Sequence, residues 1–425
     1  EVMAFVSAGL RDLSISRTTV KWGIPWPDDE KHVFYVWYDA LSSYMSGVGY
    51  GDDELQWEKW WPADLHLIGK EILRFHAVYW PAFLMAADEP LPQQVFAHGW
   101  WLFDYEKMSK SRGNIALPQP IARVLGIDGL RYFLLREMVF GQDCNFSHGA
   151  LVTRYNSDLA NGLGNLASRT LAMIDAYFGR QIPQVKSEVR SQKSETPTEE
   201  GVSDNPPKSQ LENLARRTIA AVTRHYDSYE FSLALEAIWR LIAATDKYIS
   251  DAKPWEIHRT QEIARGGTLD ITEDDAAKER LAGVLYTAAE ALRIVTALAH
   301  PVLPHATEKI WQQLGQFRRL SELKLDDLTW GELKAGTAIG EPEAIFPRVK
   351  REETIERMEA MEQEMRNPPA AAAATPNAAQ AEAPKDDKIG IEDFTKVEMR
   401  VGEVKSAERV ANADKLLKVL VDIGT

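Results

Sequence analysis

The spacing of apolar residues changes at about Gly149, and this change constrains the fold more than any other feature. Before it, the short apolar runs Lys31–Tyr38 and Asp64–Ile68 predict buried strands followed by helices, and Val95–Ala97 predicts a third strand. Strands that alternate with helices favour a parallel sheet, which binds ligands at the carboxyl ends of its strands.

After Gly149 the apolar residues recur with the 3.6-residue spacing of amphipathic helices. Several such segments in succession predict an α-helical bundle. The segment Pro183–Gln210 interrupts them with Ser, Thr, Glu, Lys and Pro, and we expect it to be a mobile loop. The predicted helices are Arg154–Tyr177, Leu211–Tyr226, Phe231–Ser250, Ala276–Ala299 and Pro304–Leu314.

Beyond the bundle the chain has three further segments. Lys350–Arg366 is rich in Glu and predicts a solvated charged helix, and Pro368–Pro384 is an Ala/Pro tract typical of a semi-extended linker. From Ile389 to Thr425 an alternating pattern returns, which predicts a separate, small β module.

Composition excludes several classes of protein. The 425 residues suffice for about three domains, and 49 Lys and Arg against 63 Asp and Glu give a formal charge of −14. This acidity argues against indiscriminate nucleic-acid binding but permits a local site. The single cysteine, Cys144, cannot form an internal disulfide and suits a reducing compartment. Because we find neither a long apolar run nor a signal peptide, we expect a cytoplasmic protein without a membrane span.

The string Lys107-Met108-Ser109-Lys110-Ser111, continued by Arg112-Gly113-Asn114, carries the clearest chemical signal. Two lysines separated by small hydroxyl residues make a cationic loop that can follow charge onto a leaving pyrophosphate. A generic K-x-x-K is usually only a solvated basic turn, but the whole string is far more specific. It resembles the signature loop of class I aminoacyl-tRNA synthetases.

A second block combines Val36–Tyr44 with His66–His76 and Tyr79-Trp80-Pro81. On a helix, Ile72, Phe75, His76 and Tyr79 would share one face. Aromatic rings there could line a slot for a flexible thioether, because sulfur packs well at ring edges. The alternative for each ring taken singly is an ordinary place in the core.

Together with Ser16-Arg17-Thr18, Trp22–Pro25 and Phe96–Trp100, these strings resemble the methionyl-tRNA synthetases. The resemblance extends from about Arg11 to Phe346 and again from Ile389. It implies a methionine site lined by Trp37, Ala40, Leu41, Tyr44, Ile72, Phe75, His76 and Trp80. It implies an ATP site made by Gly69, Glu71, His98, Gly99, Trp101, Lys107, Ser109, Lys110 and Ser111, with Lys107 and Lys110 as the catalytic pair on the phosphates.

Two marks in the bundle suggest contacts with unpaired bases. Asn165 and Arg169 are spaced i, i+4 on one helix face, and Trp255 follows Pro254 where a helix is expected to end. Asn and Arg can bond to base edges and Trp can stack on a splayed base, although Trp255 could equally be a capping core residue. The resemblance implies that these three residues read the CAU anticodon.

The expected fold is therefore α/β plus α. Residues 1–148 would be the C-terminal half of a Rossmann-like class I catalytic domain, and residues 149–346 an anticodon-binding bundle. Residues 347–387 would be a charged helix and linker, and residues 388–425 the start of a tRNA-binding OB-fold. When complete, such a module would allow a homodimer.

The activity implied is ATP- and Mg²⁺-dependent activation of L-methionine, followed by transfer to tRNA(Met). The chain lacks the H-x-G-H-like ATP turn of the resembled proteins and their connective insertion, which is where zinc would be expected. We therefore expect a fragment that forms little adenylate by itself. Two alternatives stay open: a non-catalytic tRNA-binding protein, or another class I synthetase, for leucine, valine, isoleucine or cysteine.

Overall fold

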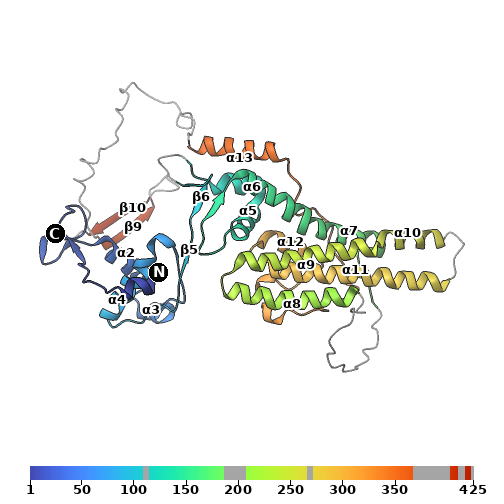
Figure 1. Cartoon of the computed structure of the whole chain (residues 1–425), viewed down its shortest axis with the longest axis horizontal. Coiled ribbons are helices and arrows are strands. Elements are labelled where there is room, and N and C mark those ends of the chain that lie inside the picture. The colour runs from blue at the N-terminus through green and yellow to red at the C-terminus, as the bar shows by residue number, and fades with distance from the viewer. Residues whose placement is uncertain (109–113, 186–206, 266–270, 367–402, 410–416, 423–425) are drawn as a thin grey trace, which may run out of the picture. The chain divides into compact units, whose positions relative to one another are not determined.

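The computed structural model describes residues 1–108, 114–185, 207–265, 271–366, 403–409 and 417–422 (Figure 1). The chain divides into two compact units, and each is described by itself. The first unit comprises Glu1–His98 with Ala373–Thr425, and the second comprises Gly99–Ala372. The predicted domain boundaries stay predictions.

The first unit begins with helix α1 (Val2–Ser7) and a small antiparallel sheet. Strand β3 (Asp29–Phe34) lies between β1 (Ser16–Arg17) and β2 (Pro25–Trp26). The prediction of a strand over Lys31–Tyr38 is therefore wrong in two respects: the strand ends at Phe34, and it belongs to an antiparallel sheet instead of the parallel one. Aromatic and β-branched residues favour a strand there, but β3 is paired with β1 and β2 only as far as Phe34, and helix α2 starts at Val36.

The expected parallel pairing occurs between β4 (His66–Gly69) and β5 (Val95–His98). The segment between these strands changes helical type, from a 3₁₀ turn to a π-helix to an α-helix. π-helical turns are rare overall, and those that occur often lie at functional sites. The helical elements of this unit are α2 (Val36–Ser46), α3 (Glu54–Trp60), η1 (Lys70–Ile72), η2 (Phe75–Tyr79) and α4 (Trp80–Ala86).

The second unit opens with a three-stranded sheet in which β6 pairs antiparallel to β7 and parallel to β8. Helix α5 (Pro118–Glu137), which the apolar pattern did not single out, follows the lysine motif. The strands are β6 (Trp101–Phe103), β7 (Glu106–Lys107) and β8 (Cys144–Phe146).

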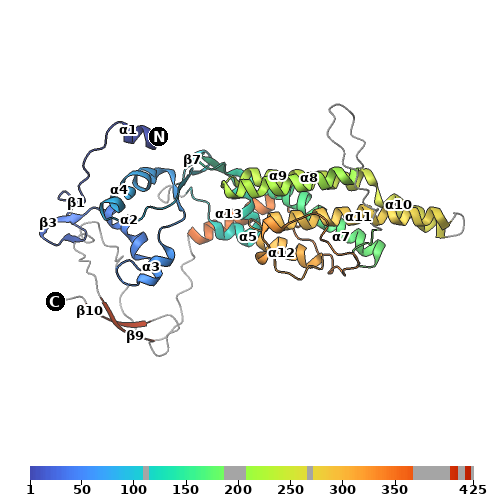
Figure 2. The ribbon, with the colours of Figure 1, turned by 90° about the horizontal axis from the view of Figure 1, so that it is seen from below.

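The predicted helical bundle is confirmed, and its long helices α8, α9 and α11 lie side by side (Figures 1 and 2). The first predicted helix, Arg154–Tyr177, comprises the π-helix η3 and the α-helix α7, and the helical run begins earlier, with α6 at His148. The helices are α6 (His148–Arg154), η3 (Tyr155–Gly164), α7 (Asn165–Phe178), α8 (Pro207–Asp227), α9 (Phe231–Ala252), α10 (Pro254–Arg265), α11 (Ile271–Ala299) and α12 (Pro304–Gln313), followed by short turns η4 (Leu320–Glu322) and η5 (Leu325–Asp327).

The core of the second unit is centred on α11, in which Leu285, Leu292 and Leu298 have no exposed surface. The stretch Asp275–Ala299 has the length and hydropathy of a membrane span, but 89% of its apolar window is buried within the protein. A core helix has the same properties.

The predicted loop, linker and charged helix differ in how far the structure describes them. The loop predicted over Pro183–Gln210 lies mostly outside the described residues, and its end is wrong because α8 begins at Pro207. The Ala/Pro linker lies wholly outside them. The charged helix is confirmed as α13 (Arg351–Arg366), but it is not simply solvated: Thr354, Met358 and Glu362 are buried, and the helix packs on α5 and α6.

The C-terminal β module is described only in part. Strands β9 (Glu403–Arg409) and β10 (Leu417–Asp422) form an antiparallel pair with a register shift at Leu420/Val421. Most of its other predicted β residues, from Phe394 to Val401, lie outside the described residues. The OB-fold stays a prediction.

Candidate functional site

Two of the expected ATP residues meet at the carboxyl ends of parallel strands. Gly69 ends β4, His98 ends β5, and the two are paired in register. Glu71 follows at once in η1, and its carboxylate lies so close to Gly69 that a Cβ there would be 2.6 Å from Glu71 Oε2. A side chain at position 69 would therefore displace the Glu71 carboxylate, at the edge where ligands bind in such sheets.

Most of the expected methionine residues come together around one group of rings, which we call the aromatic slot and define as Trp37, Tyr44, Phe75 and His76. Trp37 stacks on Phe75, with ring centroids 3.9 Å apart and an interplanar angle of 8°. The edge of His76 faces Trp37 at 6.4 Å. Helix α2 supplies the first two rings and the π-helix η2 the other two.

A chain of hydrogen bonds fixes the polar edge of the slot. His76 Nδ1 lies 3.0 Å from the carbonyl oxygen of Ile72, which can only accept, so Nδ1 carries the proton. In the neutral ring His76 Nε2 then accepts from the Tyr44 hydroxyl, also at 3.0 Å. Tyr44 is 37% exposed and His76 only 2%, so the hydroxyl is the accessible end of this chain.

The remaining methionine residues differ in exposure. Ala40 is exposed and Ile72 half-buried, whereas Leu41 and Trp80 are each only 1% exposed. The last two belong to a buried cluster with Met45, Trp61 and Leu84. They therefore occupy ordinary core positions, and their expected part in binding methionine stays a prediction.

One residue of this region, His66, was missed by sequence reasoning. Trp80 Nε1 lies 3.3 Å from His66 Nε2, and the His66 ring is 4.5 Å from that of Tyr44. Burial, helped by the nearby His76, lowers the pKa of His66 to about 4. The signal was available, because His66 and Ile68 alternate on the inner face of β4.

The expected residues Gly99, Trp101 and Lys107 belong to the second unit. At Gly99 a Cβ would lie 1.9 Å from the carbonyl oxygen of Gln142, so no side chain fits. Trp101 packs with its ring 6.0 Å from Phe133, which places it partly in the core.

Lys107 is exposed at the end of β7, with Nζ 4.1 Å from the centroid of the Trp100 ring. Asn114 Nδ2 donates to the Lys107 carbonyl at 3.2 Å, so the residues on either side of the motif are joined. Ser109, Lys110 and Ser111 lie outside the described residues.

The expected anticodon residues share one side of the bundle, which we call the anticodon face and define as Asn165, Arg169 and Trp255. The guanidinium carbon of Arg169 lies 5.0 Å from the Trp255 ring centroid, a cation–π distance. Trp255 is 39% exposed and Asn165 is also exposed. The helix end expected before Trp255 is confirmed: α9 ends at Ala252, Lys253 is left-handed, and Pro254 begins α10.

Helix α9 contributes two polar groups beneath Arg169. Arg169 Nη1 donates to Ser250 Oγ at 3.3 Å and lies 4.0 Å from Asp246 Oδ1. Burial raises the pKa of Asp246 to about 6, although the charge of Arg169 acts in the opposite direction. A base that stacked on Trp255 would meet a ring already backed by a cation.

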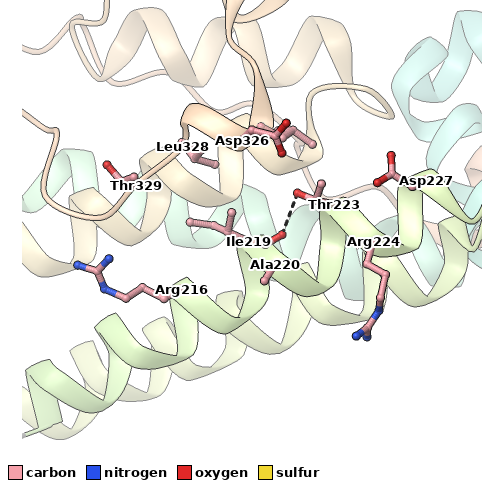
Figure 3. A pocket seen from close by; sticks show the side chains of 10 residues that line it. Arg216, Ile219, Ala220, Thr223, Arg224, Asp227, Asp326, Leu328 and Thr329 are labelled. Atoms are coloured by element: carbon pink, nitrogen blue, oxygen red, sulfur yellow. Dashed lines mark hydrogen bonds between the residues drawn. The ribbon is translucent and has the colours of Figure 1, made fainter.

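A separate pocket of about 470 Å³ lies between α8 and η5 (Figure 3). No predicted site residue lines it. Its charges are mixed, with Arg216 and Arg224 against Asp227 and Asp326, and the Thr223 hydroxyl donates to the Ile219 carbonyl. Arg216 is also paired with Glu212, so the pocket favours no class of ligand.

Comparisons with known proteins agree with the motifs. Residues 1–171 match the family model described as tRNA synthetases class I (M), and residues 209–380 match the anticodon-binding domain of tRNA ligases. The methionine–tRNA ligase of Halalkalibacterium halodurans is 41% identical over 99% of this chain, and that of Bacillus subtilis is 42% identical over 99%. In each case the chain spans 58% of the relative's length.

Solved structures give the same result. Mycobacterium tuberculosis methionyl-tRNA synthetase in complex with methionyl-adenylate aligns with a TM-score of 0.68 and 41% identity, covering 82% of this chain and 62% of that one. Its apo form aligns with a TM-score of 0.66. The match to the class I catalytic model, within which the KMSKS string lies, and the match to the anticodon-binding domain place this chain in the family of the class I methionyl-tRNA synthetases.

Proposed function

We propose that this chain supplies the methionine-binding, pyrophosphate-binding and anticodon-binding parts of a methionine–tRNA ligase. The observation that carries the proposal is the aromatic slot, in which the Tyr44 hydroxyl and His76 form one polar edge among otherwise apolar rings. A thioether fits such a slot because sulfur is polarizable and packs at ring edges. The reaction takes place in the cytoplasm, with tRNA(Met), L-methionine and ATP as substrates.

The first step is attack of the methionine carboxylate on the α-phosphorus of ATP, which gives methionyl-adenylate and pyrophosphate. Gly69, Glu71 and His98 would hold the adenosine, since two parallel strands end there. Lys107 and Lys110 would stabilise the charge that develops on the pyrophosphate. No side chain acts as a nucleophile, so positioning and charge stabilisation carry the step. Mg²⁺ would neutralise the phosphates of ATP, as it does when bound mainly through substrate phosphates.

In the second step the terminal ribose hydroxyl of tRNA takes the acyl group. The anticodon face would select the tRNA, with Trp255 stacking on one base while Asn165 and Arg169 bond to base edges. The partial β module at the C-terminal end would add affinity for tRNA as an OB-fold, and a complete module would allow dimerisation.

A chimaera tests the proposal. This chain replaces the aligned 423-residue stretch of the Bacillus subtilis ligase, which restores the portion of the relative that the chain does not span. We expect methionine-dependent ATP–pyrophosphate exchange, with leucine, valine, isoleucine and cysteine inactive. Exchange driven by one of those amino acids would assign another synthetase. A folded chimaera that binds tRNA but gives no exchange would favour a non-catalytic tRNA-binding role for this chain.

A further inference from the structure

The segment that follows the lysine motif is held by a helix more than 230 residues further along the chain. Arg366 Nη2 of α13 donates to the carbonyl oxygen of Ile115 at 2.5 Å. The backbone N–H of Leu117 donates to Glu362 Oε1, also on α13, at 3.2 Å. The backbone leaving the motif is therefore fixed by side chains of α13 before α5 begins at Pro118.

Glu362 is the centre of this arrangement. Its side chain is only 5% exposed, and besides Leu117 it accepts from His148 Nε2 at 3.0 Å. Its second oxygen, Oε2, lies 3.3 Å from Arg366 Nη2. Both carboxylate oxygens thus have donors, as a buried charge requires. Glu362 lies on the buried face of α13 with Thr354 and Met358, where a carboxylate without donors would be costly.

The same carboxylate reaches the strands that carry the motif's other end. His148 is 5% exposed and packs edge-on against Phe103 of β6 and Phe146 of β8, with centroids 6.0 and 5.4 Å apart. Strand β6 pairs with β7, where the motif begins at Lys107. Helix α13 therefore contacts the segment after the motif directly and the strands before it through His148, while Asn114 joins the two sides by its bond to the Lys107 carbonyl.

We propose that Glu362 and Arg366 are positioning residues for the lysine motif, and that docking of α13 fixes the described residues that flank it, Lys107 before it and Ile115 and Leu117 after it. The inference rests on the proposed function for its catalytic consequence, and on the described contacts of α13 for its structural part. A displacement of about 1 Å in a positioned charge can cost about 10²-fold in rate, so an anchor of this kind affects turnover without touching substrate.

Three variants form a graded test: Glu362→Ala, Glu362→Gln and the matched control Glu364→Gln, which changes an exposed glutamate of the same helix. In the chain itself, hydrogen–deuterium exchange at the Leu117 amide should become about tenfold or more faster in Glu362→Ala. In Glu362→Gln the Leu117 amide should lose less protection, because the amide oxygen of Gln can still accept its hydrogen bond. The control should exchange as wild type, and protection in α8, α9 and α11 should be unchanged in all three.

In the chimaera, Glu362→Ala should lower kcat for pyrophosphate exchange about tenfold while KM for methionine changes less than about twofold. Unchanged protection at Leu117, or loosening spread evenly over the second unit with a matching fall in melting temperature, would overturn the inference. So would a loss of protection at Leu117 with kcat unaltered. A wild-type chimaera without exchange would instead reject the proposed function, while the amide comparison would still decide whether α13 anchors the motif.

Discussion

The aromatic slot of the first unit and the anticodon face of the second use similar side chains in opposite ways. In the slot, His76 is 2% exposed and Trp37 stacks on Phe75, so the rings are bound to one another. On the anticodon face, Trp255 is 39% exposed, and its described partner is the cation Arg169. Under the proposed function, the difference follows from the ligands: a small apolar ligand binds rings preorganised in the protein, whereas a base stacks on a ring left open.

The two regions also differ in the direction in which burial shifts the pKa of a titrating side chain. Burial keeps His66 neutral beside the slot by lowering its pKa to about 4. Burial raises the pKa of Asp246 beneath the anticodon face to about 6, so that this carboxylate is ionised only at the expense of its desolvation. In both regions burial favours the neutral form of the titrating group, which lowers the pKa of a histidine and raises that of a carboxyl.

The largest expected effect is on the rate of adenylate formation, and it should leave both binding regions unchanged. Lys110→Ala in the chimaera should slow adenylate formation by about 10²-fold or more with methionine affinity little changed, because charge on the pyrophosphate develops mainly in the transition state. Pre-steady-state kinetics would measure it. Lys309→Ala, which removes an exposed lysine of α12, should behave as wild type. An unaltered rate for Lys110→Ala would reject the role of the lysine motif.

The next effect tests the open ring. Trp255→Ala should weaken binding of a CAU anticodon stem-loop to the chain by roughly 5- to 150-fold, since stacking on a base contributes about 1–3 kcal/mol. A fluorescence titration at modest salt would measure it, with a scrambled loop as the reference ligand. Phe317→Ala removes an aromatic side chain that is 96% exposed outside the face and should bind normally. Equal binding of CAU and scrambled loops would show that this face does not recognise the anticodon.

A smaller effect tests the closed rings. Tyr44→Phe combined with His76→Ala removes the polar edge of the slot, and the preference for methionine over norleucine should fall by about tenfold. Calorimetric titration of both amino acids would show it. Tyr105→Phe changes a tyrosine that is 83% exposed and should leave the preference intact. If the double variant binds both ligands as wild type does, the methionine site lies elsewhere.

The smallest effect contrasts the two titrating groups. Folding lowers the pKa of His66 from 6.5 to about 4, so the unfolded chain binds more protons between these values and stability rises with pH through this window. Folding raises the pKa of Asp246 from 3.8 to about 6, so stability falls as pH rises from 3.8 to 6. His66→Gln and Asp246→Asn should each remove a pH dependence of stability on the order of 1 kcal/mol per pH unit, and the two slopes should have opposite signs. Urea unfolding across pH 4 to 7 would measure both, and slopes of the same sign would contradict the burial argument.

Much of the helical unit was predictable because its signal is local. The bounds of α9 and α12 agree with the apolar spacing to within two residues, since a helix that buries one face repeats every 3.6 residues. The strand at Lys31–Tyr38 was not predictable to the same degree. The same aromatic and β-branched residues suit a strand or a helix, and only pairing with β1 and β2 decides that β3 ends at Phe34.

The sequence by itself determined the family, the lysine motif and the residue types of the slot and the anticodon face, because each is recognised from residues that are neighbours in the chain. Tertiary structure alone decided which of those residues are open and which are buried, as with Tyr44 against Trp80. It also decided that α13 is anchored rather than solvated, since Glu362 meets Leu117 and His148 across more than 200 residues of chain. A local pattern reports the period of a helix, but the partner of a buried charge is set by contacts between residues far apart in the sequence, and these exist only in the folded chain.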